Sequence, residues 1–131
     1  MKVAFATQDN IHINAHFGWA KKVAIYDVYA DGYYFLHTVE FTGELKEDGN
    51  EDKLLPKIDA VADCKLVYVS AIGSSAASRL LEHNITPLKA PSEEDEIIDV
   101  LNDLVKTLGS PPPWLRKALG MKTPDLSFAD V

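Results

Sequence analysis

The sequence predicts an α/β domain built on a five-stranded mixed sheet with about three helices. Three features of the chain lead to this fold class. Two apolar runs rich in β-branched and aromatic residues, 3–7 and 22–29, stand near the start and are typical of strands. A third run, 33–41, alternates along its length as a half-buried strand does. The first three strands are expected to form an antiparallel meander, and from residue 54 onward helical and strand patterns alternate along the chain.

Turn residues and apolar runs place the strands. Ala30-Asp31-Gly32 predicts the hairpin between the second and third strands, because Asp-Gly suits a tight turn. Residues 65–72 form a nearly continuous apolar run, which favours a strand covered on both faces. Residues 86–90 predict a short fifth strand.

Helical spacing predicts three helices. An N-cap at Asp52 would put Pro56 in the fourth position of the first helix, where its missing N–H has no helical partner anyway. The second helix opens at Gly73-Ser74-Ser75 and ends at Asn84, a plausible left-handed cap. The third begins at Ser92, in an arrangement close to a capping box. The core-facing residues are expected to be Leu54, Leu55, Ile58, Val61 and Ala62 in the first helix, Ala76, Ala77, Leu80 and Leu81 in the second, and Ile97, Ile98, Leu101, Leu104, Val105 and Leu108 in the third.

Composition bounds the organisation and the partners of the chain. A length of 131 residues is sufficient for one domain, expected over residues 1–110 and followed by a C-terminal extension over 111–131. The net charge of −7 argues against nucleic acid as a partner, because duplex binding needs a basic surface. The single cysteine, Cys64, excludes an intrachain disulfide. With no apolar run of membrane-spanning length and no signal peptide, a cytoplasmic location is expected.

A polar loop over residues 8–18 carries two of the four histidines, His12 and His16. If the first and fourth strands are parallel neighbours, their carboxyl ends share one edge of the sheet, and this loop meets the start of the second helix there. Backbone amides at a helix start attract anions, so the edge suits an anionic or metal-containing ligand. The candidate ligand-contacting residues are His16, as the principal one, with His12, Asp9, Asn10, Gly73, Ser74 and Ser75.

The other histidines and the cysteine have simpler interpretations. His37 falls on a strand and His83 at a helix end, where a positive side chain is favourable, so both are expected to be structural. His12 is explained as well by an ordinary loop role as by binding. Cys64 stands before the fourth strand, about 20 Å from the His16 loop, so it is expected to be a buried residue and a metal ligand only across an interface.

Several segments of the chain resemble a known family. His16-Phe17-Gly18 after the first strand and Ile72-Gly73 before the second helix are similar to the dinitrogenase iron-molybdenum cofactor-binding family. Within that family, residues 48–54 (Asp-Gly-Asn-Glu-Asp-Lys-Leu), Asp63-Cys64 and residues 113–118 resemble one group of nitrogenase accessory proteins. The likeness extends through Leu119.

The resemblance implies a ribonuclease H-like fold and a cytoplasmic carrier, not an enzyme. Such a carrier takes an iron–sulfur precursor of the nitrogenase iron-molybdenum cofactor from the radical enzyme that makes it and passes it to the assembly scaffold. The histidine of the His-Phe-Gly motif, here His16, is the position that the resemblance implicates in holding the cluster. A preformed cluster brings its own sulfides, so one or two protein ligands are enough.

Two alternatives stay open at this stage. The first is a metal-dependent nuclease of the same fold, which would need clustered carboxylates on neighbouring strands. Asp9, Asp27, Asp59 and Asp63 are available, but their positions do not predict one cluster. The second is a protein-interaction module without bound cofactor, which would use the His16 loop and the Trp114 segment.

Overall fold

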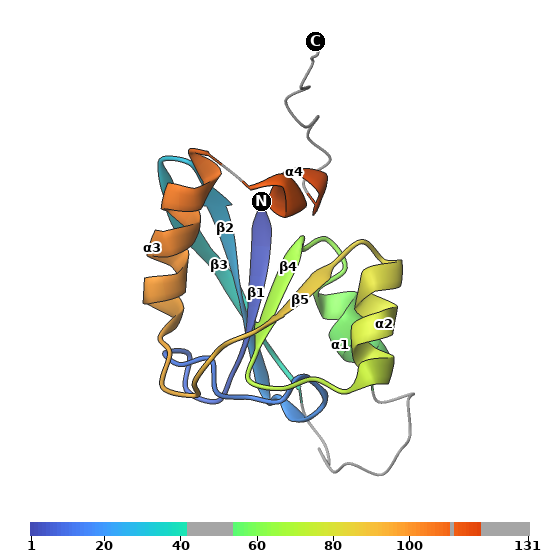
Figure 1. Cartoon of the computed structure of the whole chain (residues 1–131). Helices are drawn as coiled ribbons and strands as arrows, with labels where there is room; N and C mark the ends of the chain where they lie inside the picture. Colours follow the sequence, from blue (N-terminus) through green and yellow to red (C-terminus); the bar gives the residue numbers. More distant parts are fainter. Residues whose placement is uncertain (42–53, 111, 119–131) are drawn as a thin grey trace.

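The sheet has five strands in the order β3-β2-β1-β4-β5 (Figure 1). The structure, a computed structural model, describes residues 1–41, 54–110 and 112–118. Strand β1 runs antiparallel to β2 and parallel to β4, while β2 and β3 are antiparallel and β4 and β5 are parallel. The predicted mixed sheet with an N-terminal meander is therefore confirmed. The strands are β1 (Lys2–Thr7), β2 (Lys22–Tyr29), β3 (Gly32–Glu40), β4 (Leu66–Val69) and β5 (Thr86–Lys89). The helices of the described residues are the short 3₁₀ helix η1 (Phe17–Trp19) and α1 (Leu55–Ala60), α2 (Ser74–Glu82), α3 (Ile97–Leu108) and α4 (Pro113–Ala118).

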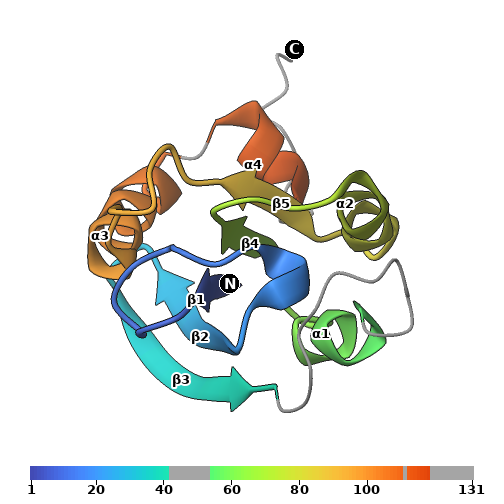
Figure 2. The same cartoon turned by 90° about the horizontal axis from the view of Figure 1, so that it is seen from below.

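Helices cover both faces of the sheet, so β1 is buried on both sides (Figure 2). Alternate residues of β1 enter the two hydrophobic clusters, Ala4 and Ala6 the first and Val3 and Phe5 the second. Of the four α-helices described, α1 and α2 contribute side chains to the first cluster, and α3 and α4 contribute side chains to the second. This two-sided burial explains why the sequence of β4 is almost continuously apolar.

Helix α1 is described from Leu55 to Ala60. Leu54 occupies its N-cap position without a side-chain hydrogen bond, and Pro56 stands at the start of the helix. Proline fits there because the first helical N–H groups have no intrahelical acceptor. The expected cap, Asp52, lies outside the described residues.

The predicted start of α3 at Ser92 is wrong. The helix begins at Ile97 with Glu96 at the N-cap, four residues after the predicted N-cap at Ser92. The reason is tertiary: the N–H of Ile97 donates to the carbonyl of Ile11, and the carbonyl of Asp95 accepts from the N–H of Ile13. The segment before α3 is therefore held extended by the loop that follows β1. Ser92 instead accepts a hydrogen bond from the N–H of Glu94 in a local turn.

Four predicted core residues face solvent instead. Leu81 on α2 has 57% of its surface exposed, Leu55 on α1 and Ile98 on α3 have 50%, and Ala62 after α1 is also exposed. Strand β3 also departs from simple alternation. Its register with β2 shifts between Ile25 and Tyr26. Tyr33, before this irregularity, packs on the second cluster, whereas Val39, after it, packs on the first. One extra residue in a strand moves every following side chain to the other face. Asn84 adopts the predicted left-handed conformation, with φ of 61°.

Helix α4 packs on the second cluster through Leu115, which is fully buried. The boundary expected after residue 110 stays a prediction, although this contact ties at least one turn of the extension to the domain. No helix within the described ranges combines the length and the apolarity that crossing a membrane requires.

Candidate functional site

The loop after β1 is hydrogen-bonded to the end of β4. The N–H of Ser70 donates to the carbonyl of Ala15, and the N–H of Phe17 donates to the carbonyl of Ala71. His16 is thereby paired in parallel with Ala71, two residues before the start of α2 at Gly73. Figure 1 shows the loop at the edge of the sheet where β4 runs toward α2. The main chain of the His16 loop thus lies beside the start of α2, as the sequence predicts.

The imidazole of His16 is held by its own turn. Its Nδ1 atom accepts a hydrogen bond from the N–H of Gly18 at 3.0 Å, and its ring stacks on the ring of Trp19 with centroids 4.8 Å apart. The side chain is partly buried rather than enclosed by aliphatic groups. Because an N–H can only donate, Nδ1 carries a lone pair, and the proton of the neutral ring is on Nε2. Nε2 has no hydrogen-bond partner within the described part of the chain.

Gly18 allows the ring to lie this close. A Cβ atom at position 18 would stand 3.3 Å from Cε1 and 3.4 Å from Nδ1 of His16, which is tighter than ordinary van der Waals contact. A side chain at position 18 would therefore displace the imidazole by a few tenths of an ångström. Phe17, on the inner side of the turn, is fully buried in the first cluster and anchors it.

A buried lysine lies beneath this turn. Lys57 of α1 is only 2% exposed, and its Nζ donates to the carbonyl oxygen of Gly18 at 2.7 Å. The ammonium also lies 5.2 Å from the ring centroid of Phe41, in a cation–π arrangement. Burial lowers the pKa of Lys57. Sequence reasoning missed this residue, although Lys57 falls on the buried helical stripe of Leu54, Ile58 and Val61, where a charged side chain signals a specific partner.

The first half of the loop is organised by Asp9. Its carboxylate accepts hydrogen bonds from the N–H groups of Ile11 and His12, at 2.9 and 2.8 Å, and Oδ2 lies 2.7 Å from Nδ1 of His12. These bonds, the backbone bond from His12 first, hold the pKa of Asp9 well below its usual range. The same carboxylate raises the pKa of His12. The two side chains thus satisfy each other.

Asn10 also has a structural position. It is left-handed, with φ of 63°, and its side-chain oxygen accepts a hydrogen bond from Thr38 at 3.3 Å. His12 itself pairs with Glu96 before α3, whereas His16 pairs with Ala71 after β4. The structure therefore docks the two histidines on different elements and leaves only His16 beside the start of α2.

The start of α2 is exposed. Gly73, Ser74 and Ser75 are all exposed, the first turn carries no acidic side chain, and Gly73 caps the helix without a side-chain hydrogen bond. A Cβ atom at Gly73 would have no neighbour within 4 Å. Backbone N–H groups at a helix N-terminus attract anions, because they have no acceptor within the helix and lie at the positive end of its dipole. Direct contact of these residues with a ligand stays a prediction.

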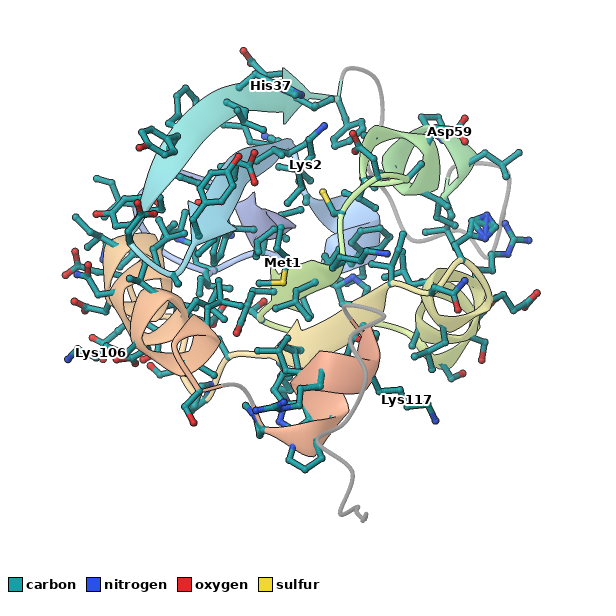
Figure 3. All side chains as sticks on the ribbon, turned by 90° about the horizontal axis from the view of Figure 1, so that it is seen from above. Met1, Lys2, His37, Asp59, Lys106 and Lys117 are labelled. Atoms are coloured by element: carbon teal, nitrogen blue, oxygen red, sulfur yellow. The ribbon has the colours of Figure 1, made fainter. Side chains whose placement is uncertain are left out.

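Cys64 lies at the opposite edge, before β4, and is 2% exposed in the first cluster. Burial raises the pKa of its thiol to about 12, so the thiolate that a metal requires does not form near neutral pH. His37 is exposed on β3 (Figure 3). His83 is exposed at the end of α2.

No three His, Cys, Asp or Glu side chains of the described residues are grouped so that they could hold a metal ion. Asp27 and Asp63, two of the carboxylates considered for a nuclease, have separate partners. Asp27 binds the terminal ammonium of Met1 at 3.1 Å, and Asp63 binds Lys2 at 2.6 Å. What the described chain presents is one imidazole beside an exposed helix start.

Fold and site together define a small α/β domain that presents one imidazole beside the start of α2 and, among its described residues, no group of three metal-ligating side chains. The sequence places the domain in a family: the chain belongs to the dinitrogenase iron-molybdenum cofactor family, whose sequence model matches residues 1–107. It is 50% identical over 120 residues to protein NifX of Herbaspirillum seropedicae, which covers 91% of this chain and 82% of that protein. It is 42% identical over 133 residues to protein NifX of Azotobacter vinelandii, with 100% of this chain and 83% of that protein covered.

Two further likenesses have narrower meaning. Over 87 residues the chain is 33% identical to the FeMo cofactor biosynthesis protein NifB of Bradyrhizobium diazoefficiens, which covers 66% of this chain and 17% of that protein. The crystal structure of PH0822 superposes with a TM-score of 0.56 at 19% identity over 100% of both chains. The structural likeness shows the fold alone.

Proposed function

We propose that this chain is a carrier in the biosynthesis of the nitrogenase iron-molybdenum cofactor, and that it binds and transfers an iron–sulfur precursor of that cofactor. The observation that carries the proposal is the His16 turn: a partly buried imidazole fixed beside the exposed start of α2. Membership of the dinitrogenase iron-molybdenum cofactor family supports it. The domain would hold its cargo and not transform it.

Sparse ligation fits a carrier. A preformed cluster supplies its own sulfides, so the protein needs one metal ligand or hydrogen-bond donor and a surface that accepts negative charge. In the free protein Nε2 of His16 bears the proton and would donate to a cluster sulfide. A metal–nitrogen bond would form only after Gly18 releases Nδ1, either at Nδ1 itself or at Nε2 once the ring proton has moved to Nδ1. Loss of the Gly18 hydrogen bond would offset part of the energy of the metal–nitrogen bond, which favours release.

The proposed contact residues are His16 and the start of α2, at Gly73, Ser74 and Ser75. Asp9, Asn10 and His12 would shape the loop and contribute only at its margin, because their polar groups already bind one another or Thr38. The strand order, with three antiparallel strands followed by two parallel ones, supports assignment to the ribonuclease H-like fold.

The partners follow from the cargo. The carrier would receive the cluster in the cytoplasm from the cofactor-synthesis radical enzyme and deliver it to the assembly scaffold. A relative named FeMo cofactor biosynthesis protein NifB contains a segment similar to this chain, which supports a donor that shares the domain.

The test is retention of cargo. The iron–sulfur product of the cofactor-synthesis radical enzyme, isolated anaerobically, is mixed with the chain, and iron per chain is measured after desalting. The wild type should stay coloured, and His16→Ala should lose iron retention by about tenfold or more. His37→Ala is the matched control, since His37 is exposed on β3 (Figure 3). Equal retention by His16→Ala and wild type contradicts the role of His16.

The second candidate function is a protein-interaction module without cofactor. Two large apolar residues of the loop, Ile11 and Trp19, are 52% and 45% exposed, which favours contact with another protein. If the wild-type chain retains no iron under anaerobic conditions but binds the assembly scaffold, this alternative is correct.

A further inference from the structure

The buried ammonium of Lys57 joins two elements that are 39 residues apart in the sequence. Its acceptor, the carbonyl oxygen of Gly18, belongs to the turn that carries His16. Taking an ammonium group out of water is unfavourable unless it gains strong hydrogen bonds. A lysine in the buried stripe of α1 thus indicates a task that an apolar residue cannot perform.

The peptide unit that Lys57 contacts closes the turn. The carbonyl of Gly18 and the N–H of Trp19 belong to one peptide group, and that N–H donates to the carbonyl of His16 at 3.0 Å. Hydrogen bonds at the two ends of one peptide group polarise each other and strengthen together. Fixing this peptide fixes Trp19, on whose ring His16 stacks, and it fixes Gly18, whose N–H binds Nδ1 of His16.

We propose that Lys57 is the positioning residue of the site, whose ammonium holds the Gly18–Trp19 peptide and thereby orients the His16 ring toward an anionic metal–sulfur cargo. This inference rests on the proposed function for the identity of the cargo, but the positioning itself is a property of the free protein. The same ammonium places a positive charge beneath the turn, shielded from water, where an anion above the turn would feel it.

The competing interpretation is that Lys57 only fills space with its aliphatic stem. Lys57→Met distinguishes this interpretation from the positioning role, because methionine has a side chain of similar length but no charge. Lys57→Arg keeps the charge and the donors. Lys106→Met is the matched control, since Lys106 is exposed on α3, which covers the other face of the sheet (Figure 3).

The first measurements use the protein without cargo. Hydrogen exchange of the Trp19 amide should become about tenfold faster in Lys57→Met and stay unchanged in Lys106→Met. The ring nitrogens of His16 should show one tautomer, protonated on Nε2, in the wild type and a mixture in Lys57→Met. Lys57→Arg should restore part of both signals. A folded Lys57→Met protein with wild-type exchange at Trp19 and wild-type signals at His16 overturns the proposal.

A second measurement needs no variant, in case Lys57→Met does not fold. In the wild type the Nζ hydrogens of Lys57 should be protected from exchange and give a distinct ¹H–¹⁵N signal, and absence of any protected ammonium overturns the proposal. Iron retention, assayed with the isolated product of the radical enzyme, then tests the cargo. If retention falls severalfold in Lys57→Met, both proposals hold. If the wild type retains no iron while the changes at Trp19 and His16 occur, the carrier function fails and the positioning role stands.

Discussion

The main-chain N–H of Gly18 lies 3.0 Å from Nδ1 of His16 and donates a hydrogen bond to it. The bond closes a short ring within the turn and fixes which edge of the imidazole faces inward. In this state His16 is a hydrogen-bond donor through Nε2 and not a ready metal ligand. If the chain is the carrier proposed above, loading and release of a cluster would be coupled to the making and breaking of this one backbone hydrogen bond.

Gly18→Ala should disturb the ring without unfolding the chain. The added methyl group would stand 3.3 Å from Cε1 of His16, so the ring must shift by a few tenths of an ångström. We expect a loss of about 1 kcal/mol in the free energy of unfolding, measured by urea denaturation, and a severalfold loss of iron retention. Gly32→Ala is the control, because a Cβ atom there has no neighbour within 4 Å. Unchanged His16 ring signals and iron retention in Gly18→Ala would show that the close approach has no role.

Asp9→Asn should lower the pKa of His12. The carboxylate of Asp9 raises the pKa of His12 in the folded protein. The interaction between the two side chains therefore stabilises the fold fully at a pH below about 6.5, the ordinary pKa of histidine. This stabilisation is lost as the pH rises through the raised pKa of His12 in the folded protein. Asp9 itself has a lowered pKa in the folded protein. Its contribution to stability is therefore present above the ordinary pKa of an aspartate and is lost as the pH falls through the lowered pKa. NMR titration of His12 in wild type, Asp9→Asn and the urea-unfolded chain checks the first term. A folded wild type that titrates like the unfolded chain would refute the pairing.

Cys64 should be unreactive and dispensable for binding. Its thiol is buried and has a pKa of about 12, so a thiol reagent at pH 8 should label no cysteine in the native protein and one after denaturation. Cys64→Ala should cost about 1 kcal/mol of unfolding free energy through lost packing and leave iron retention unchanged. Rapid labelling of the native thiol, or loss of retention in Cys64→Ala, would restore Cys64 as a ligand across an interface.

Leu115→Ala should test whether α4 is part of the domain. Leu115 is fully buried against the second cluster, so its truncation should lower the free energy of unfolding by about 2–5 kcal/mol. Trp114 stands next to it and is 48% exposed, so Trp114→Ala should cost less than about 1 kcal/mol. Equal small effects of both substitutions in urea denaturation would place the domain boundary at residue 110, as the sequence predicts.

Much of the fold follows from local sequence patterns. Apolar runs and spacing predict all five strands and their mixed arrangement, and Asn84 is predicted as a left-handed cap. The likeness of His16-Phe17-Gly18 to a cofactor-binding family singles out the histidine that the fold brings beside α2. These features are determined locally because side-chain periodicity and turn preferences act over a few residues.

Other features depend on contacts between distant segments, and only the tertiary structure decides them. The start of α3 is delayed because Ile11 and Ile13 take the hydrogen bonds of the segment before it. Lys57 finds its acceptor 39 residues away, and no spacing rule within α1 names Gly18 as the partner. The sequence alone determined that this chain forms a mixed sheet with a histidine loop at one edge. Packing decided which histidine stays available, because hydrogen-bond partners for His12, Gly18 and Lys57 are set by how the layers meet.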